Sequence, residues 1–208
     1  MGQLAAGPLA AMSLQDAMSY DRLADIKRIN VIGTSGSGKS TLSRSLSQSL
    51  GLPCIEMDAV YWGANWQEPT DDEFLSRIKT ITDGTQWILD GNYSRTTTTK
   101  WSRVQLVIWM DLPFLQTIYR VTRRCIQRSV YQTEIWPGTG NRETLRKAFL
   151  SRESVILWAL GSYRNNRRRY AKMMTAPEFA HIWFVRLQGS RDVNELLMAA
   201  EATTKRSA

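Results

Sequence analysis

Histidine and cysteine are scarce in this chain, whose 208 residues include one His and two Cys. Cys54 and Cys125 lie far apart and form no CxxC pair, which predicts two free thiols rather than a disulfide framework. Free thiols are typical of a reducing compartment, so the expected location is the cytoplasm. His181, the single histidine, begins a short apolar run, and we assign it no role.

Long apolar runs are also missing. No stretch approaches the roughly 20 residues that span a membrane, so no membrane partner is expected. The Ala- and Gly-rich start lacks the positive segment and the cleavage site of a signal peptide. Residues 1–27 have the character of an N-terminal extension, either flexible or containing one short helix. Residues 28–202 are expected to form one domain.

Acidic residues are scarce in one part of the chain. Between Leu112 and Lys172 there are thirteen Arg or Lys and three acids, a local charge of +10 in a chain whose net charge is +8. Most of these cations are Arg, which binds phosphate oxygens through two parallel hydrogen bonds. The block therefore favours a polyanionic partner, either nucleotide phosphates or a nucleic-acid backbone, over a merely solvated helix face.

Short apolar segments alternate with amphipathic ones from Arg28 onward. Strands are expected at residues 29–32, 54–57, 87–89, 104–110 and 182–187. Helices are expected at residues 39–50, 71–81, 113–128, 142–170 with a break near Gly161, and 193–201. Thr70 and Glu73 have the spacing of a capping box. The alternation predicts a three-layer α/β fold with a parallel, five-stranded sheet, whose ligands bind at the carboxyl ends of the strands.

One motif carries specific chemistry. Residues 33–40 read Gly-Thr-Ser-Gly-Ser-Gly-Lys-Ser, which fits the P-loop pattern G-x-x-x-x-G-K-[ST] between an expected strand and an expected helix. Such a loop turns backbone N–H groups toward phosphate, and its Lys reaches the β- and γ-phosphates while its Ser ligates Mg²⁺. The sequence therefore predicts binding of ATP or GTP with Mg²⁺. The residues expected at the nucleotide are Gly33, Ser35, Gly36, Ser37, Gly38, Lys39, Ser40 and Thr41.

Two acidic residues follow strands that we expect beside this loop. Asp58 and Asp90 can each hold Mg²⁺ through water or accept a proton from an attacking hydroxyl. A helix cap or a turn carboxylate is the alternative for either residue. The sequence leaves the two catalytic roles unassigned between them.

A pair of arginines shares one face of the helix after residue 113. Arg120 and Arg124 are four residues apart, so both side chains can point at the same ligand, one toward the base and one toward phosphate. A surface pair is the alternative. Arg124 joins Lys39 and the two aspartates in the expected catalytic set.

Three segments carry a family resemblance. Asp111-Leu112-Pro113 with Arg120 and Arg124 is similar to the fourth-strand element of adenylate kinases, where the first Arg lies against adenine and the second contacts phosphates. Residues 55–66 and 87–96, the latter reading Trp-Ile-Leu-Asp-Gly-Asn-Tyr-Ser-Arg-Thr, resemble the adenylate-kinase-like DNA topology modulation (FlaR-like) proteins. The resemblance implies a P-loop kinase fold, ATP as the nucleotide, and a small helical lid at about residues 129–146.

The acceptor side of the site is less sharply marked. Arg95, beyond a tight turn, can hold an anionic acceptor, and the aromatic residues after Asp58 can form a flat-walled pocket, although core packing explains them equally well. Arg164 and Arg167 stand where the family has basic residues on its late helix. The substrate residues expected are Asp58, Tyr61, Trp62, Asn92, Arg95, Arg164 and Arg167.

These observations lead to one function and two alternatives. The leading expectation is Mg²⁺-dependent phosphoryl transfer from ATP to a small acceptor, such as a nucleoside or nucleotide, under a lid that excludes water. A nucleotide-dependent nucleic-acid-binding or DNA topology modulation protein is the main alternative. Plain nucleotide hydrolysis is less favoured, because no water-positioning Gln follows a strand. No Asn-Lys-x-Asp signature indicates guanine.

Overall fold

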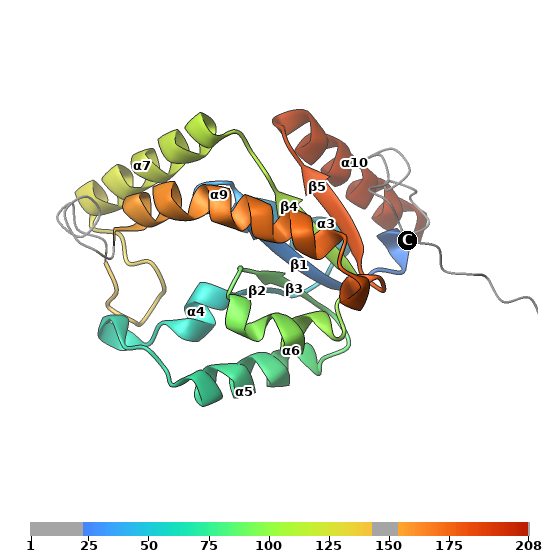
Figure 1. The fold of residues 1–208 in the computed structure, drawn as a ribbon, viewed down its shortest axis with the longest axis horizontal. Coiled ribbons are helices and arrows are strands. Elements are labelled where there is room, and N and C mark those ends of the chain that lie inside the picture. The colour runs from blue at the N-terminus through green and yellow to red at the C-terminus, as the bar shows by residue number, and fades with distance from the viewer. Residues whose placement is uncertain (1–22, 143–153, 208) are drawn as a thin grey trace, which may run out of the picture.

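The protein is described here by a computed structural model, which covers residues 23–142 and 154–207. Its centre is a five-stranded sheet in the order β2-β3-β1-β4-β5, and every pairing is parallel. The predicted α/β fold with a five-stranded parallel sheet is therefore confirmed (Figure 1). The strands are β1 (Arg28–Gly33), β2 (Cys54–Glu56), β3 (Trp87–Asp90), β4 (Leu106–Met110) and β5 (Trp183–Leu187).

Helices cover both faces of the sheet and create two apolar cores. One core joins the sheet to α3 (Lys39–Leu50) and α10 (Ser190–Ser207), and the other joins it to α5 (Asp71–Thr82), α6 (Thr97–Trp101) and α9 (Val155–Met174). Neighbouring strand residues belong to different cores, as the side-chain period of two requires: Val31 faces the first and Ile32 the second. Two more helices are α4 (Met57–Tyr61) and α7 (Phe114–Tyr131).

Most predicted elements occur where the pattern puts them. Helix α3 has the predicted bounds, and α5 begins with the predicted capping box of Thr70 and Glu73. Helix α9 continues through Gly161, so the predicted break is wrong. Glycine costs a helix about 1 kcal/mol, and the burial of Ala159 and Tyr163 on either side of Gly161 offsets that cost. The predicted helical stretch before Ser154 lies largely outside the described residues.

The ordered fold begins before Arg28. Leu23 and Ile26 are 1% and 8% exposed and belong to the core beneath α3 and α10, although they fall in the range expected as an extension. An apolar pair three residues apart can cover the end of a sheet face, which explains why this short piece is buried. The rest of that expected extension, residues 1–22, lies outside the described residues.

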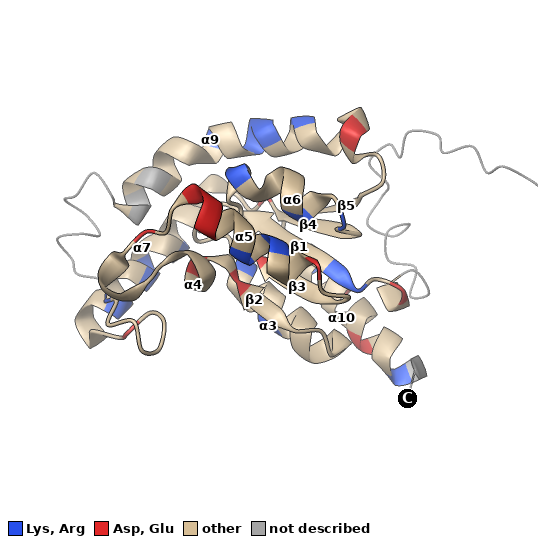
Figure 2. Cartoon of the chain, turned by 90° about the horizontal axis from the view of Figure 1, so that it is seen from below, with Lys and Arg blue, Asp and Glu red and all other residues tan. Residues whose placement is uncertain are grey.

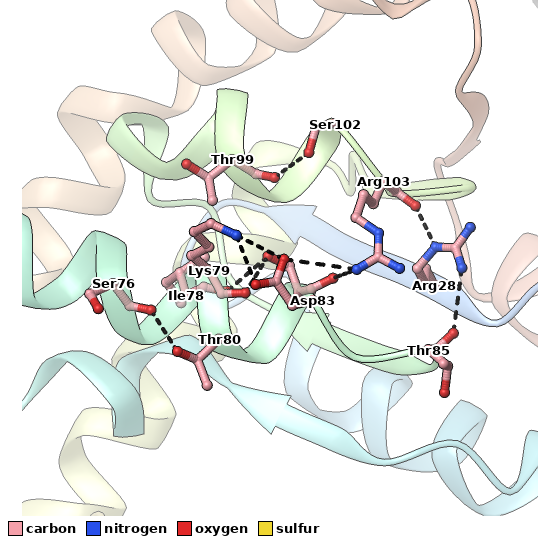
Figure 3. Close-up of polar contacts among 11 residues, drawn as sticks. Arg28, Ser76, Ile78, Lys79, Thr80, Asp83, Thr85, Thr99, Ser102 and Arg103 are labelled. Carbon is pink, nitrogen blue, oxygen red and sulfur yellow. Dashed lines mark hydrogen bonds and ion pairs between the residues drawn. The ribbon is translucent and has the colours of Figure 1, made fainter.

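Polar contacts hold the amino edge of the sheet together, opposite the P-loop. Arg28, at the start of β1, donates to the carbonyl oxygens of Arg103 and Thr85 (Figure 3). Nη1 of Arg103 lies 3.9 Å from Oδ1 of Asp83. These exposed contacts join the loops that precede β3 and β4. In the described part of the chain, no helix is both long and apolar enough to cross a membrane. Cys54 and Cys125 are not joined in a disulfide, as predicted.

Candidate active site

The P-loop connects β1 to α3 at the carboxyl edge of the sheet. Gly36 and Gly38 have φ values of +86° and +92°, which L side chains rarely adopt, and the N–H of Ser37 turns back to the carbonyl of Thr34 at 3.0 Å. Helix α3 begins at Lys39 without a side-chain cap and without an acid in its first turn. Its first N–H groups and the positive end of its dipole are thus available to an anion.

Lys39 lies between two carboxylates and one cation. Burial lowers the pKa of its amine, the charges of Asp90 and Asp58 raise it, and Arg124 lowers it again. Its Nζ is 3.5 Å from the carbonyl oxygen of Thr34 within the loop. The charges of Asp90, Asp58 and Arg124 therefore all act on the amine of Lys39, at the uncapped start of α3. These four residues are the expected catalytic set.

Asp90 ends β3 and is 6% exposed. Burial raises the pKa of its carboxyl group, whereas Lys39 and a hydrogen bond from Ser40 lower it. Its Oδ1 is buried and has no hydrogen-bond partner. An unpartnered carboxylate oxygen beside the P-loop Ser is the kind of group that fits a hydrated Mg²⁺, since this ion prefers oxygen ligands and keeps several waters. Among the described residues, no group of three or more His, Cys, Asp or Glu could hold a metal ion.

Asp58 differs from Asp90 in its surroundings. Strand β2 ends at Glu56, and Asp58 lies in the first turn of α4. The prediction that Asp58 directly follows the strand is therefore wrong. Asp58 is exposed, and its Oδ1 accepts a hydrogen bond of 2.7 Å from the hydroxyl of Tyr93. Asp58 thus stands two residues beyond the end of β2, and its charge still raises the pKa of Lys39.

Helix α7 brings two arginines to the loop. Arg124 donates a hydrogen bond of 2.8 Å from Nη2 to the hydroxyl of Ser35, and Nη1 of Arg120 lies 3.6 Å from the point where a Cβ on Gly38 would stand. Gly36 packs closely against Thr117 and Val121 of the same helix. The predicted shared face thus points at the P-loop, and Figure 2 shows further Lys and Arg along α7 and α9.

Three residues expected at the substrate have other partners. The amide of Asn92 clamps Gly33, accepting from its N–H at 2.9 Å and donating to its carbonyl at 2.6 Å. Tyr61 is 5% exposed in the core of α5 and α6, and its hydroxyl donates to Glu68. Arg167 pairs with the buried Asp111 at 3.1 Å. These three side chains therefore contact the framework of the site, and their contact with a substrate stays a prediction.

Two of the remaining acceptor candidates, Arg95 and Trp62, lie beside α4 and α5, whereas the third, Arg164, lies on α9. Arg95 pairs with Asp71, and its guanidinium lies 5.0 Å from the centroid of the Tyr61 ring, which in turn is 5.1 Å from that of Tyr93. One ring therefore separates Arg95 from the partner of Asp58. Trp62 is half-buried against Tyr61, and Arg164 is exposed on α9.

Sequence reasoning missed Tyr93 and Lys100. Tyr93 belongs to the segment that carries the family resemblance, so its position beside Asn92 was a usable signal. Lys100 ends a run of threonines and has the sequence context of a solvent-exposed residue, yet it is fully buried under the loop after β3. No local pattern could have indicated that burial.

Comparisons with known proteins agree on the fold. A shikimate kinase from Bacteroides thetaiotaomicron superposes with a TM-score of 0.51 and 8% identity, covering 86% of this chain and 99% of that one. A shikimate kinase from Acinetobacter baumannii in complex with shikimate gives 0.48 and 17%, covering 90% and 98%. A gluconokinase from Sinorhizobium meliloti gives 0.45 and 18%, covering 88% and 93%. At these identities the likeness is one of fold.

Sequence comparisons are less informative. The chain is 29% identical over 133 residues to the uncharacterized protein YqaC of Bacillus subtilis, which covers 62% of this chain and 72% of YqaC. No family model matches the chain. Membership of the DNA topology modulation family therefore stays a prediction, while the three-layer α/β P-loop kinase-like fold is supported by the sheet order and by the superposition on the shikimate kinase from Bacteroides thetaiotaomicron.

Proposed function

We propose that this chain binds ATP with Mg²⁺ and transfers the γ-phosphoryl group to a small acceptor, such as a nucleoside, a nucleotide or a similar polar metabolite. One observation carries the proposal: Lys39, Asp90, Asp58 and Arg124 are electrostatically coupled at the uncapped end of α3. A cation at the phosphates, a carboxylate for the metal, a second carboxylate and an arginine are the components of phosphoryl transfer.

The two carboxylates divide the work according to their surroundings. Asp90, buried and hydrogen-bonded to Ser40, would hold Mg²⁺ through water together with that hydroxyl. The metal, when bound, neutralises charge on the phosphate oxygens. Asp58, exposed and close to Lys39, would accept the proton of the acceptor hydroxyl as its oxygen bonds to the γ-phosphorus and the bond to ADP breaks.

Cations complete the arrangement on both sides. Lys39 and Arg124 would neutralise the charge that spreads over the transferred group, and Arg120 would lie against the base. Arg95, one ring away from the partner of Asp58, would bind an anionic group of the acceptor. Arg124 binds the P-loop Ser35, so this part of the basic block is turned toward the P-loop. That orientation favours the kinase over the nucleic-acid-binding alternative.

A lid over the acceptor is part of the proposal. In the described part of the expected lid, residues 129–142, Asn141 accepts from the N–H of Trp66 at 2.8 Å and donates to the carbonyl of Gly63 at 2.9 Å. The rings of Trp66 and Trp136 are in edge contact at 5.9 Å. The segment after α7 thus touches the segment after α4, the closed arrangement that would exclude water from a transfer.

The test is an acceptor screen with matched variants. Nucleosides, nucleotides, sugars and hydroxy acids are added singly to the full chain with Mg²⁺ and ATP, and release of ADP is followed. We expect one class to stimulate ADP release well above the acceptor-free rate, and Asp58→Asn to reduce that rate by about 10²–10⁴ while ATP affinity changes little. Unstimulated ADP release with every class, or full activity of Asp58→Asn, would overturn the kinase assignment. Tight, ATP-independent binding of duplex DNA at physiological salt would support the alternative.

A further inference from the structure

Lys100 is a buried cation that the proposed reaction does not use. It lies near the end of α6 and is 0% exposed. Its Nζ donates to the carbonyl oxygen of Asn92 at 2.8 Å and lies 3.4 Å from that of Gly91 and 3.9 Å from the sulfur of Met57. The ammonium group therefore binds the backbone of the loop after β3 through its carbonyl oxygens.

That loop is coupled to the start of the P-loop. The side-chain amide of Asn92 makes two hydrogen bonds to the backbone of Gly33, at 2.9 and 2.6 Å. The side chain of Asn30 adds a second support by donating to the carbonyl of Gly91 at 3.1 Å. Two steps thus lead from the buried amine to the first residue of the phosphate-binding loop: Lys100 to the backbone of Asn92, and the amide of Asn92 to Gly33.

The charged form of Lys100 is destabilised by burial at this position. A buried ammonium loses its hydration, and two carbonyl oxygens replace it only in part. The charged neighbour from α9 is Arg169, whose Nε is buried without a partner and which lines a cavity of about 220 Å³ next to Asn92. Burial first, and Arg169 second, lower the pKa of Lys100 to about 7. A methionine would fill the same space without this cost, which indicates that the hydrogen bonds to the loop serve a purpose.

We propose that Lys100 is a positioning residue for the phosphate-binding loop: its proton holds the backbone of Asn92, and Asn92 holds Gly33 where phosphate binds. The proposal rests on the proposed nucleotide-binding function. It adds a contribution of Lys100 to the pH dependence of nucleotide affinity, beside that of Lys39 and Asp90, whose pKa values burial also shifts.

The direction of the pH effect follows from the hydrogen bonds. Below about pH 7 Lys100 is charged, and charged donors make the stronger hydrogen bonds. As the pH rises through this value the amine becomes neutral, its hold on Asn92 weakens and the P-loop loses order. Around Lys100 the groups are Met57 from α4, the carbonyls of the loop after β3 and Arg169 from α9. Among these groups, Lys100 is the one whose pKa lies near neutral pH.

Lys100→Met is the direct test, because it keeps most of the length of the side chain and removes the amine with its proton. Affinity for ADP with Mg²⁺ is measured by calorimetry on the full chain from pH 6 to 8.5. We expect wild-type affinity to exceed that of the variant about ten- to a hundredfold at pH 6, the size of one charge-assisted hydrogen bond, and the two to converge by pH 8.5. A constant ratio across this range would overturn the proposal.

Two further measurements keep the outcome decisive. In an Asn92→Ala background, Lys100→Met should cost little additional affinity, because both changes break the same connection; additive losses would contradict it. Amide hydrogen exchange can be measured without a nucleotide. Lys100→Met should lower the protection of the Gly33 N–H, which donates its hydrogen bond to the side chain of Asn92, and should leave the protection of the Ile29 N–H in the same strand unchanged. Unchanged protection of Gly33 would refute the connection, whereas loss of protection without ADP binding would refute only the proposed function.

Discussion

Replacing Gly36 by alanine should separate the P-loop from α7. Gly36 has φ of +86°, and a Cβ there would stand 2.5 Å from the carbonyl oxygen of Thr117 and 2.9 Å from Cβ of Val121. The left-handed backbone costs an L residue about 1–2 kcal/mol, and overpacking adds about 1–3 kcal/mol. We therefore expect the free energy of unfolding to fall by about 2–5 kcal/mol. Because relief of the clash moves the loop away from α7, the hydrogen bond from Arg124 to Ser35 should break.

The assay compares this variant with Gly51→Ala, a matched control. Gly51 also has positive φ, +67°, but a Cβ there would meet nothing within 4 Å. The control should lose about 1–2 kcal/mol in urea unfolding, from backbone strain alone, and should bind ATP like the wild type. Gly36→Ala should lose more stability and at least tenfold in ATP affinity. Equal stability losses, or normal ATP binding by Gly36→Ala, would refute the packing of α7 against the P-loop as the basis of the site.

Three further variants test other parts of the account. Asp90→Asn should raise the melting temperature of the nucleotide-free protein at pH 7 and should lower turnover. Burial raises the pKa of the Asp90 carboxyl in the folded state, so the protein loses stability as the pH rises through that pKa and the carboxyl ionises. A variant that melts at a lower temperature than the wild type would contradict this. Arg95→Ala should raise the acceptor's KM more than it lowers kcat, because it removes a binding contact; the reverse pattern in steady-state kinetics would assign Arg95 to chemistry. In the wild type, the free energy of unfolding should rise by about 1.4 kcal/mol per pH unit between about pH 7 and 10, because the unfolded Lys100 still holds a proton that the folded one has released. Lys100→Met should lack this rise. Parallel pH profiles of the two proteins in urea unfolding would contradict it.

Local patterns were enough to predict the fold. The short apolar runs of the strands, the Gly-rich motif before Lys39 and the capping box at Thr70 each depend on residues within a few positions of one another. The bounds of α3 and the order of strands and helices follow from such signals. Gly161 was misleading because its cost in a helix is small compared with the burial of neighbouring side chains on α9.

Partnerships between distant segments were not predictable in this way. Asn92 and Gly33 are 59 residues apart, and nothing near Asn92 indicates that its amide turns to the P-loop instead of a substrate. Tyr61 was ambiguous between pocket and core, and only the packing of α5 decides for the core. Lys100 is the extreme case, because a charged residue after four threonines gives no sign of complete burial. Side-chain roles of this kind depend on the three-dimensional neighbourhood.

The central claim is that the loop between β1 and α3 binds the phosphates of ATP through Lys39. Calorimetric titration of Mg²⁺-ATP into the wild type and into Lys39→Ala tests it most directly, with a melting curve of each. Burial lowers the pKa of the Lys39 amine and disfavours its charge, so its removal should leave the melting temperature unchanged or higher. The account predicts one ATP bound per wild-type chain and loss of that binding in the folded variant. Absence of ATP binding by the wild type, or undiminished affinity in a folded Lys39→Ala, would contradict it.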